Sequence, residues 1–251
     1  MKLEVEDLSG HKHGHEALSS HVDFYAPYHI SGRTLSILRL ISCVISTILF
    51  LHREIFSPAE HTPDYTFLTI WANTACMVYF WAINIIVQVV PKPDPYMQQR
   101  LPTFRFMHVF VELLAAMMFV VCLMFWGFLL PDLNVQLQNN PAHYWDIIID
   151  AYGFHLLTPI LTWVEVYYNQ VCFKTKDGLI YIPILALVYS CLNFYWTKKF
   201  GIPVYAPLDW ESFGSVGFLM AAFSIVGIGF ALAKHLWNHK AKVLARQWGN
   251  Q

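Results

Sequence analysis

Long apolar runs alternate with short polar connections along the chain. A helix that crosses a bilayer needs about 20 mostly apolar residues, and six runs have roughly this length or more. They are Thr34–Leu51, Thr66–Val90, Thr103–Leu130, Asp146–Cys172, Leu179–Trp196 and Phe213–Leu236. Proline, glycine and charged residues separate the runs, as expected where helices end in water. The pattern predicts an all-α membrane protein with six transmembrane helices.

The same pattern divides the chain into one membrane domain and two polar ends. We expect a polar, histidine-rich amino-terminal tail over residues 1–33, the six-helix domain over residues 34–237, and a basic carboxyl-terminal tail over residues 238–251. Of the 16 Lys and Arg residues, only Arg53, Lys198 and Lys199 fall on the side of the odd-numbered connections. The positive-inside rule therefore predicts that both termini lie on the inner side.

Composition narrows the class of protein further. The chain is 56% hydrophobic and only 13% charged, which excludes an ordinary soluble domain. A formal net charge of -1 excludes a nucleic-acid-binding protein, which needs a basic face. The 5 cysteines lie in or beside apolar runs without CxxC spacing, and the histidines of the amino-terminal tail have no thiol or carboxylate to complete a ligand set. We therefore expect no metal and no cofactor.

Two polar side chains in the second and fourth runs are candidates for a site. A polar or ionisable group in hydrocarbon is costly unless it has a partner. With both termini inside, Thr69 and His155 lie at similar depth in the outer half of the bilayer. A threonine needs an adjacent base to become a nucleophile, so the pair is compatible with an acyl-transfer site. The alternative for Thr69 is a hydroxyl bonded back to its own helix.

Other polar residues of these helices allow several interpretations. Asn73 is four residues from Thr69 and shares its helical face, where it can orient the base or donate to an oxyanion. Glu165 is ten residues beyond His155, or ~15 Å along a helix, so a structural bond between helices suits it better. Histidines on four separate helices leave a bis-histidine haem protein as a minor alternative. These histidines are His52, His108, His155 and His235.

The order of motifs from about Leu38 to Trp237 resembles one known family. This family comprises the androgen-induced and androgen-dependent TFPI-regulating membrane proteins, six-helix threonine hydrolases of fatty acid esters of hydroxy fatty acids. The shared motifs are Phe67-Leu68-Thr69, Phe119-Val120-Val121, Phe125-Trp126, Gly153-Phe154-His155 with Glu165, Gly178-Leu179 and Val204-Tyr205-Ala206-Pro207-Leu208. Two residues depart from the pattern: Tyr152 replaces an expected histidine, and Pro159 comes one residue early.

The resemblance implies an activity and a site. Its Phe-Leu-Thr motif supplies the nucleophile and its Gly-x-His motif supplies the base, which correspond to Thr69 and His155 here. The chain is then expected to be an intramembrane lipid esterase that cleaves fatty acid esters without a cofactor. Its partners are lipid substrates and bilayer lipids, and its location is an endomembrane or the cell membrane.

A second function class uses the same fold as an accessory subunit. The aromatic-rich stretch Phe24–Ile30 is compatible with a strip that docks on other membrane subunits, or with an anchor in the headgroup layer. A host of this kind would be a large membrane complex, such as a respiratory-chain assembly in the mitochondrial inner membrane. The esterase chemistry could then be present or lost.

Overall fold

The computed structural model describes residues 22–56, 67–92, 98, 100–205 and 207–249. Most of these residues belong to helices, and two short strands pair with each other. The elements, in chain order, are β1 (Val22–Pro27), α2 (Gly32–Phe56), α3 (Leu68–Val89), α5 (Pro102–Met124), η2 (Phe125–Leu129), α6 (Leu130–Asn139), η3 (Pro141–His143), α7 (Tyr144–Tyr152), η4 (Gly153–Leu157), α8 (Thr158–Tyr168), β2 (Asn169–Val171), α9 (Thr175–Phe200) and α10 (Phe213–Gly249).

Six helical segments among the described residues are long and apolar enough to cross a membrane. They correspond one for one to the six predicted runs, which confirms the multi-pass membrane architecture by length and composition. Large apolar side chains remain exposed along α2, α9 and α10, as expected for helix faces that meet lipid. The segments are Gly32–Phe56, Leu68–Val89, Pro102–Leu129, Pro141–Tyr168, Ile180–Phe200 and Phe213–Leu244.

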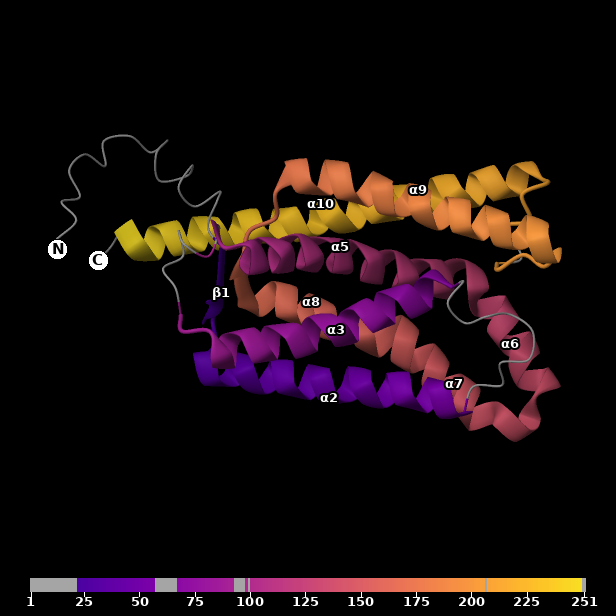
Figure 1. Ribbon diagram of the computed structural model, residues 1–251, viewed down its shortest axis with the longest axis horizontal. Helices are drawn as coiled ribbons and strands as arrows, with labels where there is room; N and C mark the ends of the chain where they lie inside the picture. Colours follow the sequence, from indigo (N-terminus) through magenta and orange to yellow (C-terminus); the bar gives the residue numbers. More distant parts are fainter. Residues whose placement is uncertain (1–21, 57–66, 93–97, 99, 206, 250–251) are drawn as a thin grey trace.

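Helix α5 forms the centre of the bundle. It packs against α3 and α8 on one side and against α9 and α10 on the other, while α2 covers α3 and α8 (Figure 1). Its inward-facing residues Val111, Leu114, Ala115 and Met118 are fully buried and join the main hydrophobic core. The central position of α5 explains why its sequence is apolar all round, unlike a helix that lies on the surface of a soluble protein.

Two membrane helices contain a π-helical turn, and a proline follows each turn. The turn η2 ends at Leu129, two residues before Pro131, and the turn η4 ends at Leu157, two residues before Pro159. Proline has no N–H and its ring clashes with the carbonyl four residues earlier, so the regular helical bond cannot form there. A π-helical turn absorbs this misfit while the helix continues.

The amino-terminal tail that we predicted for residues 1–33 is not polar throughout. Residues 1–21 lie outside the described part, but Val22–Pro27 forms strand β1 and pairs antiparallel with β2. Phe24 and Tyr28 are 0% and 3% exposed and belong to the main core. The prediction that Phe24–Ile30 forms a free docking surface is therefore wrong, because the side chains of Phe24 and Tyr28 pack in the core of this chain.

The predicted boundaries of other elements also need correction. Helix α8 ends at Tyr168, because residues 169–171 pair with β1 instead of extending the fourth helix to Cys172. Residues 131–139, predicted as a connection, belong to helix α6, which follows directly after the π-helical turn η2. Helix α10 runs to Gly249 instead of ending before a tail at residue 238. Local polarity misled these predictions, because tertiary packing decides where an element ends.

Candidate active site

Thr69 and His155 meet inside the bundle. The hydroxyl of Thr69, in the first turn of α3, lies 3.3 Å from Nε2 of His155 in the turn η4. Thr69 is buried and His155 is partly buried. The similar depth that the sequence predicted for the two residues corresponds to a direct contact.

A backbone carbonyl selects the tautomer of His155. Its Nδ1 lies 3.1 Å from the carbonyl oxygen of Ala151, which can only accept a hydrogen bond. In the neutral ring Nδ1 therefore carries the hydrogen, and Nε2 keeps its lone pair and accepts the hydroxyl hydrogen of Thr69. This is the arrangement that a general base for a threonine nucleophile requires.

Aromatic residues of η2 hold the imidazole in place. The ring of Phe125 stacks on His155 with a centroid separation of 3.7 Å and an interplanar angle of 16°. The indole Nε1 of Trp126 donates to the carbonyl oxygen of His155 at 3.0 Å. This carbonyl would normally accept from residue 159, but Pro159 has no N–H. Pro159 thus leaves the carbonyl of His155 without its regular helical donor, and the indole of Trp126 in η2 supplies one instead.

Asn73 joins the backbones of the two helices that carry the pair. Its Nδ2 donates to the carbonyl oxygens of Thr69 at 2.8 Å and Phe154 at 3.5 Å. Its Oδ1 accepts from the hydroxyl of Thr158 at 2.5 Å. Because both amide hydrogens have backbone acceptors, Asn73 fixes the spacing of α3 and η4 rather than pointing at a reacting group. Of its two predicted roles, the geometry fits orientation, exerted through the backbone.

Glu165 belongs to a separate cluster near β1 and β2. Its carboxylate accepts from Arg39 Nη2 at 2.6 Å and Nε at 3.0 Å, and from the hydroxyl of Tyr79 at 3.1 Å. Arg39 and Glu165 are 2% and 3% exposed. Asn169 also donates to Glu165, and Lys240 donates to the carbonyl oxygens of Val166 and Asn169. We call this cluster the strand-end network; its members are Arg39, Tyr79, Glu165, Asn169 and Lys240.

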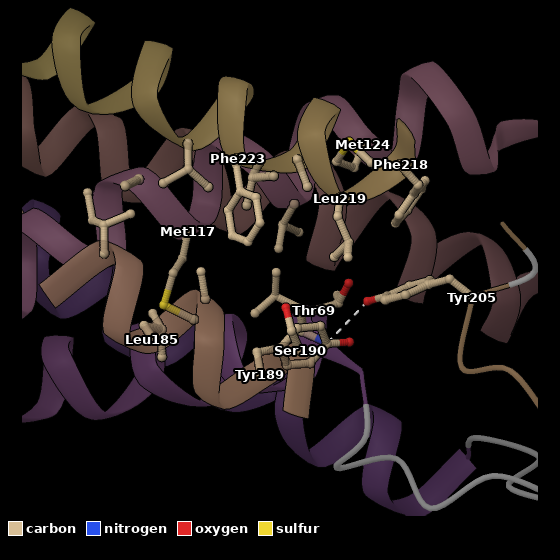
Figure 2. A pocket seen from close by; sticks show the side chains of 18 of the residues that line it. Thr69, Met117, Met124, Leu185, Tyr189, Ser190, Tyr205, Phe218, Leu219 and Phe223 are labelled. Carbon is tan, nitrogen blue, oxygen red and sulfur yellow. Dashed lines mark hydrogen bonds between the residues drawn. The ribbon is translucent and has the colours of Figure 1, made fainter. Parts of the chain in front are cut away.

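A long apolar cavity is lined in part by Thr69 and lies between α5, α9 and α10 (Figure 2). Its volume is about 880 Å³ including the open solvent at its mouth. The lining extends from Leu113 of α5 to Leu129 of η2, which corresponds to about 24 Å of helix. Polar groups are few and include Thr69, Tyr189, Ser190 and Tyr205. The cavity has the shape and polarity of a site for a long hydrocarbon chain with one polar group.

Part of this lining was not predicted from the sequence. Tyr205 was named only as part of a motif, and it lies at the cavity with its hydroxyl 3.1 Å from the backbone nitrogen of Leu68. Tyr189 and Phe125 had no predicted role either. Pro207, two residues after Tyr205, indicated an ordered connection. The sequence pattern did not predict that this connection contacts α3.

Three of the four histidines that the haem alternative uses, His52, His108 and His155, have protein partners. Both ring nitrogens of His52 face carboxylates, Asp150 at 3.2 Å and Asp146 at 3.5 Å. Nε2 of His108 lies 2.6 Å from the carbonyl oxygen of Cys172. Within the described ranges, His, Cys, Asp and Glu side chains form no group of three or more that is placed to hold a metal ion.

Comparisons of the chain with models of known protein families, with curated protein sequences and with solved structures find no match. The interpretation of the site therefore depends on its own geometry.

Proposed function

We propose that this protein is an intramembrane lipid esterase in which Thr69 is the nucleophile and His155 is the general base. The observation that carries the proposal is the contact between Thr69 Oγ1 and His155 Nε2 at one end of an apolar cavity. The motif order that resembles the membrane threonine hydrolases supports the same assignment. The acyl chain of a fatty acid ester would occupy the cavity, with its carbonyl carbon at Thr69.

The reaction has two halves. In the first, the hydroxyl of Thr69 attacks the ester carbonyl while Nε2 of His155 takes its proton. The bond to the alcohol then breaks, and His155 returns the proton to the leaving oxygen, which leaves an acyl group on Thr69. In the second, water attacks this acyl group and gives a proton to His155. The carboxylic acid departs, and the proton on His155 restores the hydroxyl of Thr69.

The proposed topology places both termini on the inner side of the membrane. The distribution of Lys and Arg supports this orientation. Strand β1 and the carboxyl-terminal end of α10 also lie at one end of the bundle (Figure 1). Protease protection of tags at the two termini tests the topology, and tags on opposite sides would refute it. An endomembrane or the cell membrane is the proposed location, from the family resemblance.

Activity of the purified chain tests the mechanism. In detergent micelles with a fatty acid ester of a hydroxy fatty acid, we expect hydrolysis that Thr69→Ala abolishes and His155→Ala lowers at least about a hundredfold. Thr74→Ala, on the same helix, and His235→Ala, on an exposed face of α10, are the matched controls and should retain wild-type rates. A phosphonate ester probe should attach to Thr69, as peptide mass spectrometry can establish. Wild-type turnover by Thr69→Ala would refute the proposal.

A further inference from the structure

Two tyrosine hydroxyls meet the beginning of α3, next to Thr69. The backbone N–H of Leu68 donates to the hydroxyl oxygens of both Tyr189 and Tyr205, each at 3.1 Å. Leu68 is the first residue of α3, so its N–H has no acceptor within its own helix. Tyr189 belongs to α9 and Tyr205 to the connection between α9 and α10. Two segments distant in sequence thus converge on the turn that carries the nucleophile (Figure 2).

Hydrogen-bond directions show what these phenols can do. Because Leu68 donates to both oxygens, the hydrogen of each phenol is directed at another acceptor. Thr69, Tyr189 and Tyr205 line the same cavity. Since Thr69 gives its own hydrogen to His155, its oxygen does not donate to either phenol. The phenolic hydrogen of Tyr205, bound through its oxygen to the residue before Thr69, is therefore available to an acceptor beside the atom that would attack a substrate.

An oxygen anion forms at this place during ester cleavage. When Thr69 Oγ1 bonds to an ester carbon, the former carbonyl oxygen becomes an anion one bond away from that carbon. The Tyr205 phenol, held by the backbone N–H of Leu68 next to Thr69, lies beside this place. Donors aimed at such a developing charge contribute strongly to catalysis in sites that exclude water. The amide of Asn73, by contrast, is already bound to two backbone carbonyls.

We propose that Tyr205 is a catalytic residue that donates its phenolic hydrogen to the oxyanion of the tetrahedral intermediate, and that Tyr189 is a positioning residue for Tyr205. This inference rests on the proposed esterase function and adds the group that stabilises its transition state. Burial raises the pKa of Tyr205 above its ordinary value, which keeps the phenol protonated and able to donate at neutral pH. The anion remains an acceptor throughout, and no proton is transferred from Tyr205.

Steady-state kinetics of Tyr205→Phe test the catalytic role. Loss of one oxyanion donor should lower kcat by roughly 100-fold to 1,000-fold, while KM changes little because the phenol contacts the transition state rather than the ester. Tyr189→Phe should lower kcat by a smaller factor. Tyr195→Phe removes an exposed phenol from the same helix as Tyr189. This control should behave like the wild type.

Binding of inhibitors separates this role from a purely structural one. A long-chain trifluoromethyl ketone, which adds the Thr69 oxygen to form an oxyanion, should bind Tyr205→Phe more weakly by about the factor lost in kcat. A long-chain ether without a carbonyl should bind the variant and the wild type equally. Equal weakening of both ligands would overturn the proposal and assign Tyr205 a structural role.

A second variant covers the case in which Tyr205→Phe does not fold. Incorporation of 3,5-difluorotyrosine at position 205 keeps the hydroxyl but gives a more acidic phenol. Its kcat should fall as the pH rises through the pKa of this phenol, because a phenolate cannot donate, whereas the wild type should show no such fall. Wild-type pH profiles in the fluorinated protein would refute the inference. If Thr69→Ala keeps its activity, the esterase proposal itself fails; if only the Tyr205 changes have no effect, the esterase proposal stands.

Discussion

Two of the places where the described part of the protein buries polar groups are the strand-end network and the Thr69–His155 pair, and they differ in what surrounds them. In the strand-end network, Arg39 and Glu165 form an ion pair supported by Tyr79 and Asn169, and each charge points at another protein group. At the other end of the bundle, Thr69 and His155 make a single contact with each other beside the apolar cavity. Both places carry ionisable groups in a membrane domain, where such groups are costly and usually serve a structural or functional role.

This difference fits a structural role for the strand-end network and the chemical role that we propose for the Thr69–His155 pair. A network whose donors and acceptors satisfy one another rigidifies the helices that carry it. A hydroxyl that faces an apolar cavity, with a neutral imidazole behind it, is accessible to a substrate. The strand-end network should therefore control stability without activity, and the Thr69–His155 pair should control activity with little effect on stability.

The largest effect that tests this contrast is on stability. Glu165→Ala leaves the buried guanidinium of Arg39 without its carboxylate, and breaking such a pair costs about 3–5 kcal/mol. Denaturant unfolding in detergent measures the loss, and Glu54→Ala, an exposed carboxylate of α2, is the control. The double change Arg39→Met with Glu165→Leu should recover much of the stability, because apolar residues replace both charges.

Activity measured on the folded fraction completes this test. Because Glu165 lies ten residues from His155 and contacts the strand-end network, kcat per folded molecule should stay at the wild-type value. A large fall in kcat at full folding, with a stability loss below about 1 kcal/mol, would mean that the two places are not independent.

Substrate length tests the cavity side of the contrast. Ala222→Phe adds a ring to the lining from α10 and should lower activity on long-chain esters by roughly tenfold to a hundredfold, since each misplaced methylene costs 1–3 kcal/mol. Butyrate esters, which leave most of the cavity empty, should be cleaved at nearly wild-type rates. Ala221→Phe adds the same ring at the neighbouring position outside the lining. Equal losses on both chain lengths would contradict an acyl chain in this cavity.

A smaller effect tests how precisely the imidazole must be held. Trp126→Phe removes the donor to the His155 carbonyl and should cost about 1 kcal/mol of stability. The freed carbonyl lacks its regular helical donor because Pro159 has no N–H, so the imidazole loses one of its restraints. We expect kcat to fall up to about tenfold, or 1.4 kcal/mol, with KM unchanged. Trp145→Phe, a highly exposed tryptophan of α7, is the control, and an unchanged kcat in Trp126→Phe would show that stacking on Phe125 suffices.

The sequence predicted the architecture and the central pair for physical reasons that can be named. Apolar runs of membrane length are a strong signal, because hydrocarbon admits few alternatives to a helix. The depth of Thr69 and His155 followed from helix direction and charge bias. Side-chain directions did not follow, so the contacts of Asn73 and Tyr205 became clear only in three dimensions.

The pairing of β1 with β2 was equally inaccessible from the sequence. The strands of residues 22–27 and 169–171 are short, and the residues that pair between them are more than 140 positions apart in the sequence. Arg39 was treated only as a positive charge near the inner side, whereas it crosses to Glu165 and to the carbonyl oxygen of Phe24 at 2.8 Å. Contacts between distant segments decide such pairings, and local patterns contain no information on them.

The smallest expected effect concerns the connection that carries Tyr205. The carboxylate of Asp209 accepts from the amides of Glu211 and Ser212 and from the hydroxyls of Ser212 and Ser215, and these bonds lower its pKa well below the ordinary value. Because the pKa of Asp209 is lower in the folded state than in the unfolded state, its charged carboxylate stabilises the fold above about pH 4, the pKa of an unfolded aspartate. This stabilisation is lost as the pH falls through the folded pKa.

Asp209→Asn should therefore lower the thermal midpoint at pH 7, and the difference in midpoint from the wild type, the gap, should narrow below about pH 4. Thermal unfolding from pH 7 to pH 3 measures the gap, with Glu211→Gln as a charge-matched control in the same connection. A gap that stays constant over this range would show that the charge of the carboxylate contributes nothing to holding the connection beside Thr69.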